Sequence, residues 1–241
     1  MMHLLKYLID TILPPRCLVC GKIVLSPHSL CEECFQKVDF ITTPYCKICG
    51  MPFENQSQAV ANFVCPDCLS HKHITRLNRS AVLYNDCVQN MVLAFKFADK
   101  TLFSKLFAKW MLPAFSDIQK QGIDVIIPVP LSYKRLIKRR YNQATLLAKE
   151  FSKLTHIETD LYNLIKVRHT KPQAQMHGHA RLKNIKNAYQ IKYPERIKGK
   201  RILLIDDVMT TGATLTECAK TLIKAGAKSV DTLTLARVKK N

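Results

Sequence analysis

Four Cys-x-x-Cys pairs crowd into the first 68 residues and constrain the fold of this chain more than any other feature. The pairs are Cys17/Cys20, Cys31/Cys34, Cys46/Cys49 and Cys65/Cys68. This spacing is typical of tetrahedral zinc ligands, whereas a secreted disulfide framework would spread its cysteines along the chain. Four thiolates around one Zn²⁺ leave no position for a substrate, so we predict structural sites.

An internal repeat indicates how the pairs combine. Cys17-Leu-Val-Cys20-Gly21 recurs as Cys46-Lys-Ile-Cys49-Gly50, and a second pair without a glycine follows each copy. The repeat favours two sequential sites, one from the first two pairs and one from the last two. The alternative is an interleaved arrangement, in which the first pair combines with the third. We therefore predict a double zinc-binding, zinc ribbon-like module over residues 1–72 and a second domain over residues 73–241.

The charge of the chain indicates an anionic partner. Lys and Arg number 37 against 18 Asp and Glu, a formal net charge of +19, and two zinc sites with four thiolates each lower it to +15. Nucleic acid, anionic lipid or a phosphorylated small molecule would match this charge. No run approaches the about 18 apolar residues of a membrane span. The apolar N-terminus carries Lys6 and Asp10, so we expect a short amphipathic helix rather than a signal peptide, and a cytoplasmic protein.

Hydrophobic patterning predicts an α/β fold for the second domain. We expect strands at 80–84, 123–130, 201–205 and 229–236, and helices at 88–95, 102–113, 142–154 and 213–225. The helix that starts at residue 102 is predicted to end at Pro113. The strand at 201–205 contains four consecutive apolar residues, which is typical of burial on both faces. Strand, helix and strand in this order predict a parallel sheet flanked by helices.

The turn that follows the strand at 201–205 carries the predicted ligand site. It reads Asp206-Asp207-Val-Met-Thr210-Thr211-Gly212-Ala213-Thr214. A helix that starts in this turn offers free backbone N–H groups to a phosphate, and the threonine hydroxyls add donors. The two carboxylates suit the 2′ and 3′ hydroxyls of a ribose, so the turn predicts a ribose 5-phosphate ligand. The motifs of P-loop and dinucleotide-binding proteins are both missing.

A basic run precedes the helix at 142–154. Five cations lie within seven residues, and an aromatic residue stands at each end; the run is Tyr133, Lys134, Arg135, Lys138, Arg139, Arg140 and Tyr141. Basic groups interleaved with aromatic rings are typical of single-stranded nucleic-acid binding. A solvated helix face is the alternative, and the same cations would also suit a pyrophosphate.

The segment ILLIDDVMTTGATL resembles the 5-phosphoribosyl-1-pyrophosphate (PRPP) signature of type I phosphoribosyltransferases. The whole chain resembles the ComF/GntX family, in which a cysteine-rich module precedes a phosphoribosyltransferase-like domain. Further motifs that carry the resemblance are Lys96-Phe97, Asp124–Pro130, Asn142-Gln143-Ala144, Arg168-x-Thr170-x-x-Gln173 and Arg181-x-x-Asn184. One departure is Arg140, which stands where the family commonly has glycine.

The resemblance implies a type I phosphoribosyltransferase α/β fold and a role for each part of the site. Asp206 and Asp207 would hold the ribose hydroxyls, Thr210 to Thr214 the 5′-phosphate, and Val129 and Pro130 the pyrophosphate, with Mg²⁺ accompanying PRPP. A mobile loop containing Arg168, Lys171 and Arg181 would close over the ligand, although a solvated basic loop is equally compatible with these residues.

The resemblance also implies a function. Members of the family are competence proteins that act in natural transformation and DNA uptake, so we expect binding of PRPP and of single-stranded DNA. A DNA-translocating helicase and recombination proteins would be the partners. The alternative is an active phosphoribosyltransferase that transfers ribose 5-phosphate to a nitrogen acceptor, but the sequence contains no recognisable element for binding a purine or pyrimidine acceptor.

Overall fold

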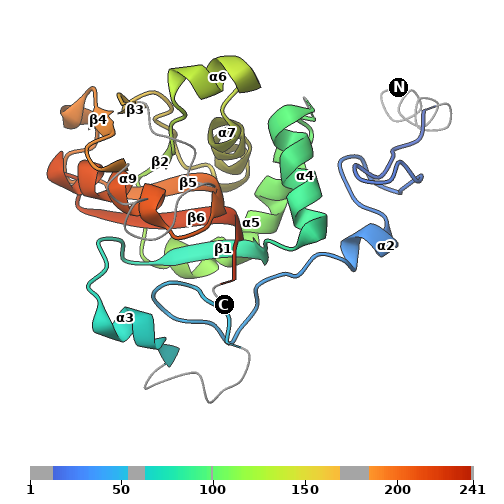
Figure 1. Cartoon of the computed structure of the whole chain (residues 1–241), viewed down its shortest axis with the longest axis horizontal. Coiled ribbons are helices and arrows are strands. Elements are labelled where there is room, and N and C mark those ends of the chain that lie inside the picture. Colours follow the sequence, from blue (N-terminus) through green and yellow to red (C-terminus); the bar gives the residue numbers. More distant parts are fainter. Residues whose placement is uncertain (1–12, 54–62, 99, 169–184, 240–241) are drawn as a thin grey trace.

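The computed structural model describes residues 13–53, 63–98, 100–168 and 185–239 and contains a four-stranded sheet (Figure 1). Its strands are β1 (Asn78–Leu83), β2 (Val125–Pro128), β5 (Arg201–Met209) and β6 (Ser229–Arg237), in the order β1-β6-β5-β2. All three neighbouring pairs run parallel. The predicted parallel sheet is therefore confirmed.

Helices cover both faces of this sheet. The helices are α4 (Asp86–Phe97), α5 (Phe103–Gln119), α7 (Gln143–Thr155) and α9 (Ala213–Lys224). A further helix, α6 (Tyr133–Arg139), has no buried residue and joins neither core cluster. Leu203 and Ile205 of β5 join a buried cluster with α4, α5 and α7, whereas Ile202 and Leu204 join a second cluster with α9. Successive strand residues point to opposite faces, which explains why the first half of this strand, residues 202–205, is apolar at every position.

Helix α5 continues through Pro113 to Gln119, so the prediction that it ends at Pro113 is wrong. Proline inside a helix removes one hydrogen bond and costs about 3 kcal/mol. Phe115 and Ile118, which lie beyond the proline, are 2% and 0% exposed. Each buried side chain contributes about 1.5–3 kcal/mol, which offsets the cost of the proline.

Two features around strand β5 also differ from the expectation. Strand β5 extends to Met209 rather than ending at Ile205, so the acid pair Asp206-Asp207 lies inside the strand. A small antiparallel sheet, β3 (Leu164–Lys166) with β4 (Tyr189–Ile191), packs against α9. Strands of three residues are too short to give a readable period, so the sequence analysis did not predict them.

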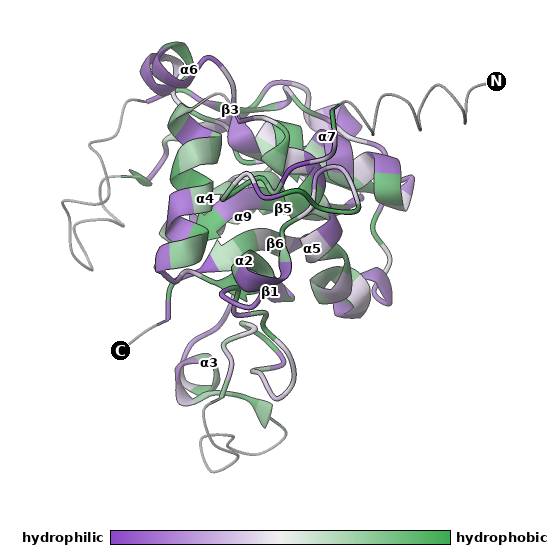
Figure 2. Cartoon of the chain, turned by 90° about the vertical axis from the view of Figure 1, so that its right-hand side faces the viewer, coloured by the Kyte–Doolittle hydropathy of each residue, from purple (hydrophilic) through white to green (hydrophobic). Residues whose placement is uncertain are grey.

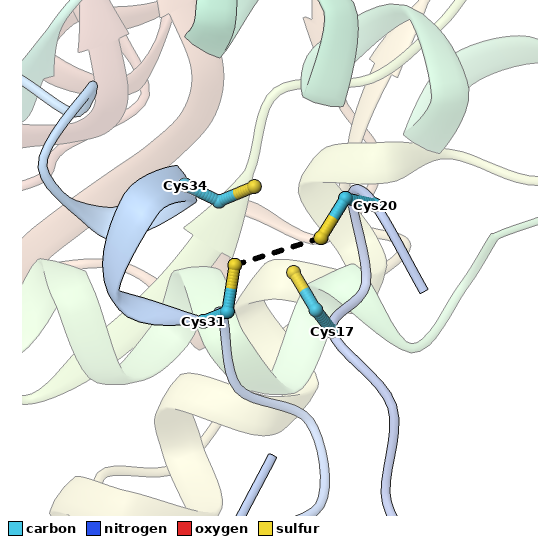
Figure 3. Close-up of side chains that lie close together, drawn as sticks. All are labelled: Cys17, Cys20, Cys31 and Cys34. Atoms are coloured by element: carbon cyan, nitrogen blue, oxygen red, sulfur yellow. Dashed lines mark hydrogen bonds between the residues drawn. The ribbon is translucent and has the colours of Figure 1, made fainter. Parts of the chain in front are cut away.

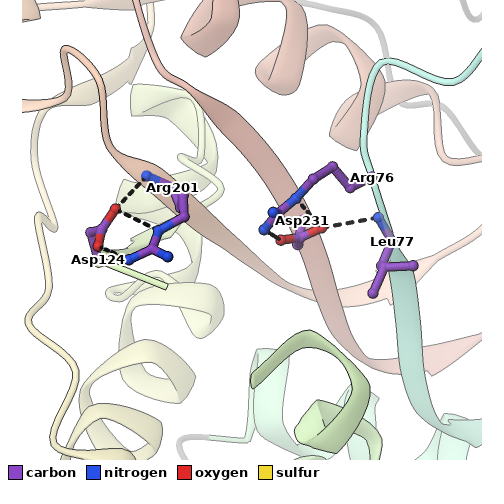
Figure 4. Close-up of polar contacts among 5 residues, drawn as sticks. All are labelled: Arg76, Leu77, Asp124, Arg201 and Asp231. Atoms are coloured by element: carbon purple, nitrogen blue, oxygen red, sulfur yellow. Dashed lines mark hydrogen bonds and ion pairs between the residues drawn. The ribbon is translucent and has the colours of Figure 1, made fainter. Parts of the chain in front are cut away.

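Two ion pairs fix the starts of the strands (Figure 4). Arg201 donates to Asp124 from its backbone N–H at 2.7 Å and from its guanidinium at 2.6 Å, which joins β5 to the start of β2. Fully buried Asp231 of β6 accepts from the guanidinium of Arg76 and, at 3.0 Å, from the backbone N–H of Leu77. The first pair joins β5 to β2, and the second joins β6 to the residues just before β1, in both cases by polar contacts.

The cysteine-rich module lies along the edge formed by β1. It contains two short helices, α2 (Glu32–Phe35) and α3 (Pro66–Ser70), which lie at separate places on the surface (Figures 1 and 2). The backbone N–H groups of Ile41 and Leu83 donate to Ala81 and Asp39 at 2.9 and 2.8 Å. The module therefore covers an edge strand that would otherwise expose unpaired groups. None of the helices in the described residues has the length and apolar character needed to cross a membrane.

The N-terminal helix predicted over the first residues falls in 1–12, outside the described residues.

Candidate functional site

The eight paired cysteines form two groups, each with all its sulfur atoms within 4.8 Å of one another. The groups are Cys17, Cys20, Cys31 and Cys34 (Figure 3), and Cys46, Cys49, Cys65 and Cys68. The distance between sulfurs is 3.5 Å for Cys20 and Cys31 and 3.7 Å for Cys49 and Cys65. Tetrahedral zinc with bonds of about 2.3 Å places its sulfurs about 3.8 Å apart, so both groups fit the ion. The sequential arrangement is confirmed, and the interleaved alternative is excluded.

Hydrogen bonds to sulfur favour the thiolate at one cysteine of the second group, Cys46. The thiol of Cys49 and the backbone N–H groups of Cys49 and Cys65 lower the pKa of Cys46 to about 4, against the opposing effect of burial. The thiolate is the form that binds zinc. Gly50 follows with φ +68°, and a side chain there would begin 2.5 Å from the carbonyl oxygen of Asn78. Glycine is therefore required where this zinc loop touches β1.

Two buried arginines hold the second zinc site against the sheet. Arg237, at the end of β6, donates to the carbonyl oxygen of Cys49 at 2.6 Å. Arg79 of β1 donates to the carbonyl oxygen of Lys47 at 2.9 Å and to Asp117 of α5 at 3.0 Å. The second zinc site is therefore fixed relative to the carboxyl end of the sheet.

The acid pair lies at this carboxyl end in a buried setting. The carboxylate of Asp207 pairs with the ammonium of Lys96 at 2.9 Å, and both side chains are mostly buried. Burial, followed by the charge of Asp207, raises the pKa of Asp206 to about 7. Next to the pair, β2 ends at Pro128, and the following Val129 donates its N–H to the carbonyl oxygen of Ile205 at 2.9 Å. Val129 and Pro130 therefore border the strand that carries both acids.

Three cations from three elements surround the acid pair. They are Lys96 of α4, Arg139 of α6 and Lys166 of β3. The guanidinium of Arg139 lies 5.2 Å from the centre of the Phe97 ring and donates to Gln143 at 3.1 Å. Burial lowers the pKa of Arg139, while the charges of Asp207 and Asp206 oppose this shift. Arg139 therefore faces the acids rather than lying with the exposed cations of α6.

Lys166 and Tyr189 are the residues that the sequence analysis missed. The ammonium of Lys166 lies 5.3 Å from the centre of the Tyr189 ring. Burial, followed by the charge of Arg135, lowers the pKa of Lys166 to about 8, while the charge of Asp206 opposes this shift. Burial raises the pKa of Tyr189, whose hydroxyl interacts with Thr214. One sequence signal could have indicated that Lys166 lies near the acid pair: it stands two residues before the Arg168-x-Thr170-x-x-Gln173 motif.

The phosphate loop, residues 210–214, joins β5 to α9 as predicted. Gly212 is the N-cap of α9 and has φ +75°, a conformation that other residues rarely adopt. The hydroxyl of Thr211 accepts from the N–H of Ala213 at 3.4 Å. Thr210 and Thr211 are exposed, and Ala213 and Thr214 form the first turn of the helix. The loop therefore presents hydroxyls and the free N–H groups of a helix start to the solvent.

The structure divides the predicted nucleic-acid residues. Tyr133, Lys134, Lys138 and Arg140 are exposed on and beside α6, whereas Arg135 is half-buried. Tyr141 is also half-buried, its hydroxyl donates to the carbonyl oxygen of Phe95 at 2.6 Å, and its ring lies 6.2 Å from the Phe95 ring. Tyr133 is the more accessible aromatic ring, with 71% of its surface exposed.

Two further expectations concern the backbone and the mobile loop. Arg140 has φ +64°, in the left-handed region that favours glycine, so this position accommodates the departure from glycine at the cost of backbone strain. Arg168 donates to the carbonyl oxygen of Lys186 at 2.7 Å, across the base of the predicted mobile loop. Lys171 and Arg181 lie outside the described residues.

Comparisons with known proteins agree with this arrangement. Residues 8–69 match the family model described as a double zinc ribbon domain, and residues 134–241 match a phosphoribosyl transferase domain. The chain therefore belongs to the class in which a double zinc ribbon is joined to a type I phosphoribosyltransferase-like α/β domain.

Similarity over nearly the whole length defines the family. The chain is 30% identical to competence protein F of Haemophilus influenzae, over 92% of this chain and 96% of that protein. It is 32% identical to competence protein ComFC of Bacillus subtilis, over 87% and 85%. It is 27% identical to the DNA utilization protein YhgH of Escherichia coli, over 93% and 97%. The chain belongs to the ComF family.

Proposed function

We propose that this protein binds PRPP along the carboxyl edge of its parallel sheet. The observation that carries the proposal is the acid pair of half-buried Asp206 and buried Asp207, which lies just before a helix start and is surrounded by three cations. The acids accept hydrogen bonds from the ribose diol, and the phosphate loop receives the 5′-phosphate. Lys96, Arg139 and Lys166 offset the acids and leave positive charge for the pyrophosphate.

Mg²⁺ is the proposed companion of the pyrophosphate group. This ion prefers oxygen ligands, and PRPP phosphates together with the carboxylates of Asp206 and Asp207 offer them. The ion would neutralise charge on the pyrophosphate, while the surrounding residues orient the ribose and exclude water.

Ligand titration by calorimetry tests the site. PRPP and ribose 5-phosphate should bind, and ribose without phosphate should not. Asp206→Ala with Asp207→Ala should abolish binding, because each charged hydrogen bond contributes about 1.5–3 kcal/mol. Thr211→Val should weaken it, and Glu195→Ala, which removes an exposed carboxylate from η4 (Pro194–Arg196), is the matched control. Unchanged PRPP affinity in the double variant would disprove the assignment.

The proposed role of the protein is in DNA uptake during natural transformation, in the cytoplasm. Three relatives carry competence or DNA utilization in their names. Helix α6 exposes Lys134 and Lys138 beside the exposed ring of Tyr133, and this combination suits the phosphates and bases of single-stranded DNA. A DNA-translocating helicase and recombination proteins would deliver and receive the strand, as the family resemblance implies.

An active phosphoribosyltransferase is the second candidate function. The domain over residues 134–241 matches phosphoribosyl transferases, and the buried cations beside the acid pair would stabilise a departing pyrophosphate. Incubating the protein with PRPP, Mg²⁺ and a nucleobase or DNA distinguishes the two functions. Released pyrophosphate would support the enzyme, and its absence with intact PRPP binding would favour the binding protein.

A further inference from the structure

A cavity of about 690 Å³ lies between the second zinc site and the phosphate loop. This volume falls within the range of about 300–1,000 Å³ that small-molecule sites occupy. One wall consists of residues of the cysteine-rich module, including Pro52 and Pro66, and of the segment that follows it, including Ile74. The other consists of Thr210, Thr211 and Gly212 of the phosphate loop, Thr216 of α9 and Arg237 of β6. The cavity therefore shares the phosphate loop with the proposed PRPP site.

The order of the strands places this cavity at one end of that site. Along the carboxyl edge, β2 is followed by Val129 and Pro130, β5 contributes the acid pair, and β6 ends at Arg237. Met209, which leads into the phosphate loop, is paired in register with Arg237. A ligand with its ribose at the acids and its 5′-phosphate on the loop would therefore meet the cavity beyond the phosphate. PRPP ends at its 5′-phosphate and would leave this space unfilled.

The chemistry of the walls suits a nucleoside. Lys72, Arg237 and Lys239 line the cavity, and their three positive charges balance Asp67 and a zinc tetrathiolate of charge −2. A neutral cavity does not favour a long polyphosphate. Apolar surface from Met51, Pro52, Ile74 and Leu215 lies beside these polar groups. Apolar walls with a few polar groups are the usual setting for a heterocyclic base.

We propose that the site accepts a ribose 5-phosphate whose phosphate continues to a second nucleoside, and that the cavity holds this nucleoside. The proposal rests on the proposed function of the acid pair and phosphate loop. It extends the proposed ligands from phosphate monoesters, such as ribose 5-phosphate, to compounds in which the 5′-phosphate is linked to a second nucleoside. The zinc module then contributes directly to ligand selection, since its residues form one wall of the cavity.

Calorimetry with ribose 5-phosphate and ADP-ribose tests the proposal on the full chain. Burying about 60 Å² of base at about 25 cal/mol per Å² corresponds to about a tenfold gain in affinity, so ADP-ribose should bind about tenfold more tightly. Thr216→Trp and Ile74→Trp each fill the cavity from opposite walls. Both should remove the gain for ADP-ribose and leave the affinity for ribose 5-phosphate unchanged.

Two controls separate the possible explanations. Thr221→Trp changes a residue of α9 outside the cavity lining and should leave both affinities as in the wild type. AMP carries the same base on a 5′-monophosphate, and Thr216→Trp should not change its affinity. Equal affinities for the two main ligands in the wild type, or equal losses in both cavity variants, would overturn the proposal. If ribose 5-phosphate itself fails to bind the wild type, the proposed function fails instead.

Discussion

The division of the basic run into exposed and inward-facing cations predicts two separable phenotypes. Lys134 and Lys138 are exposed on α6, whereas Arg139 packs on Phe97 and faces the acid pair. Each phosphate neutralised on a single strand contributes about 0.7 to the slope of log affinity against log salt. Replacing Lys134 and Lys138 with Ala should reduce the slope by about 1.4. When salt is raised from about 0.05 to about 0.2 M, DNA affinity should fall in both proteins, and the factor by which it falls should be about sevenfold smaller for the variant.

Fluorescence anisotropy with a labelled single-stranded oligonucleotide measures this slope. Tyr133→Ala should cost about 1–3 kcal/mol of DNA affinity with little change in slope, because stacking on a ring releases no counterions. Arg139→Gln is the matched control: the slope should stay as in the wild type, while PRPP binding weakens. If Arg139→Gln lowers the slope as much as the double lysine variant does, Arg139 contacts DNA phosphates, and the assignment of this residue to the ribose site is wrong.

Three further predictions follow from the zinc sites, the acid pair and the sheet. Metal analysis should find two zinc ions per chain, and Cys46→Ser should leave one, because the cysteines form two separate groups. The pKa of Asp206 is raised to about 7, and its charged form is the acceptor that the ribose diol needs beside Asp207, so affinity for ribose 5-phosphate should rise about tenfold between about pH 6 and about pH 8. Calorimetry that gives the same rise in Asp206→Asn would contradict this. Asp231→Asn should lower the free energy of unfolding, measured with denaturant, by about 1.5–3 kcal/mol, because it weakens hydrogen bonds to a charged group. Asp124→Asn, at a more exposed pair, should cost about 0–1 kcal/mol.

The zinc arrangement and the central sheet could be predicted from the sequence because each depends on a local pattern. The repeat of Cys17 to Gly21 at Cys46 to Gly50 favours the sequential pairing over the interleaved one, and the structure confirms it. The four apolar residues of β5 could be assigned to a doubly covered strand because its two faces pack against separate helix layers. In both cases, the residues that determine the structure are close together in the chain.

The remaining features depend on contacts between distant segments, which no local pattern reports. Helix α5 continues past Pro113 because Phe115 and Ile118 pack into a core that other helices and strands complete. Lys166 faces the acid pair because a short strand brings it there, from a position about 40 residues away in sequence. Arg139 belongs to a run of basic residues that look equivalent in the sequence. Only the direction of the short helix α6 turns Arg139 toward the acid pair while Lys134 and Lys138 stay exposed.

The two zinc sites differ in what they contact, and this difference bears on how the family joins a zinc module to a phosphoribosyltransferase fold. The first site is followed by Phe40, whose ring lies 5.3 Å from Trp110 of α5, on the far side of the sheet from the phosphate loop. The second is held by Arg79, near the start of β1, and by Arg237, at the end of β6, and it borders the cavity beside the phosphate loop. The first site therefore stabilises the fold, while the second also shapes the space in which a ligand would lie. A fused module is needed for this second role, since a freely tethered one would not hold a wall at a fixed distance from the loop.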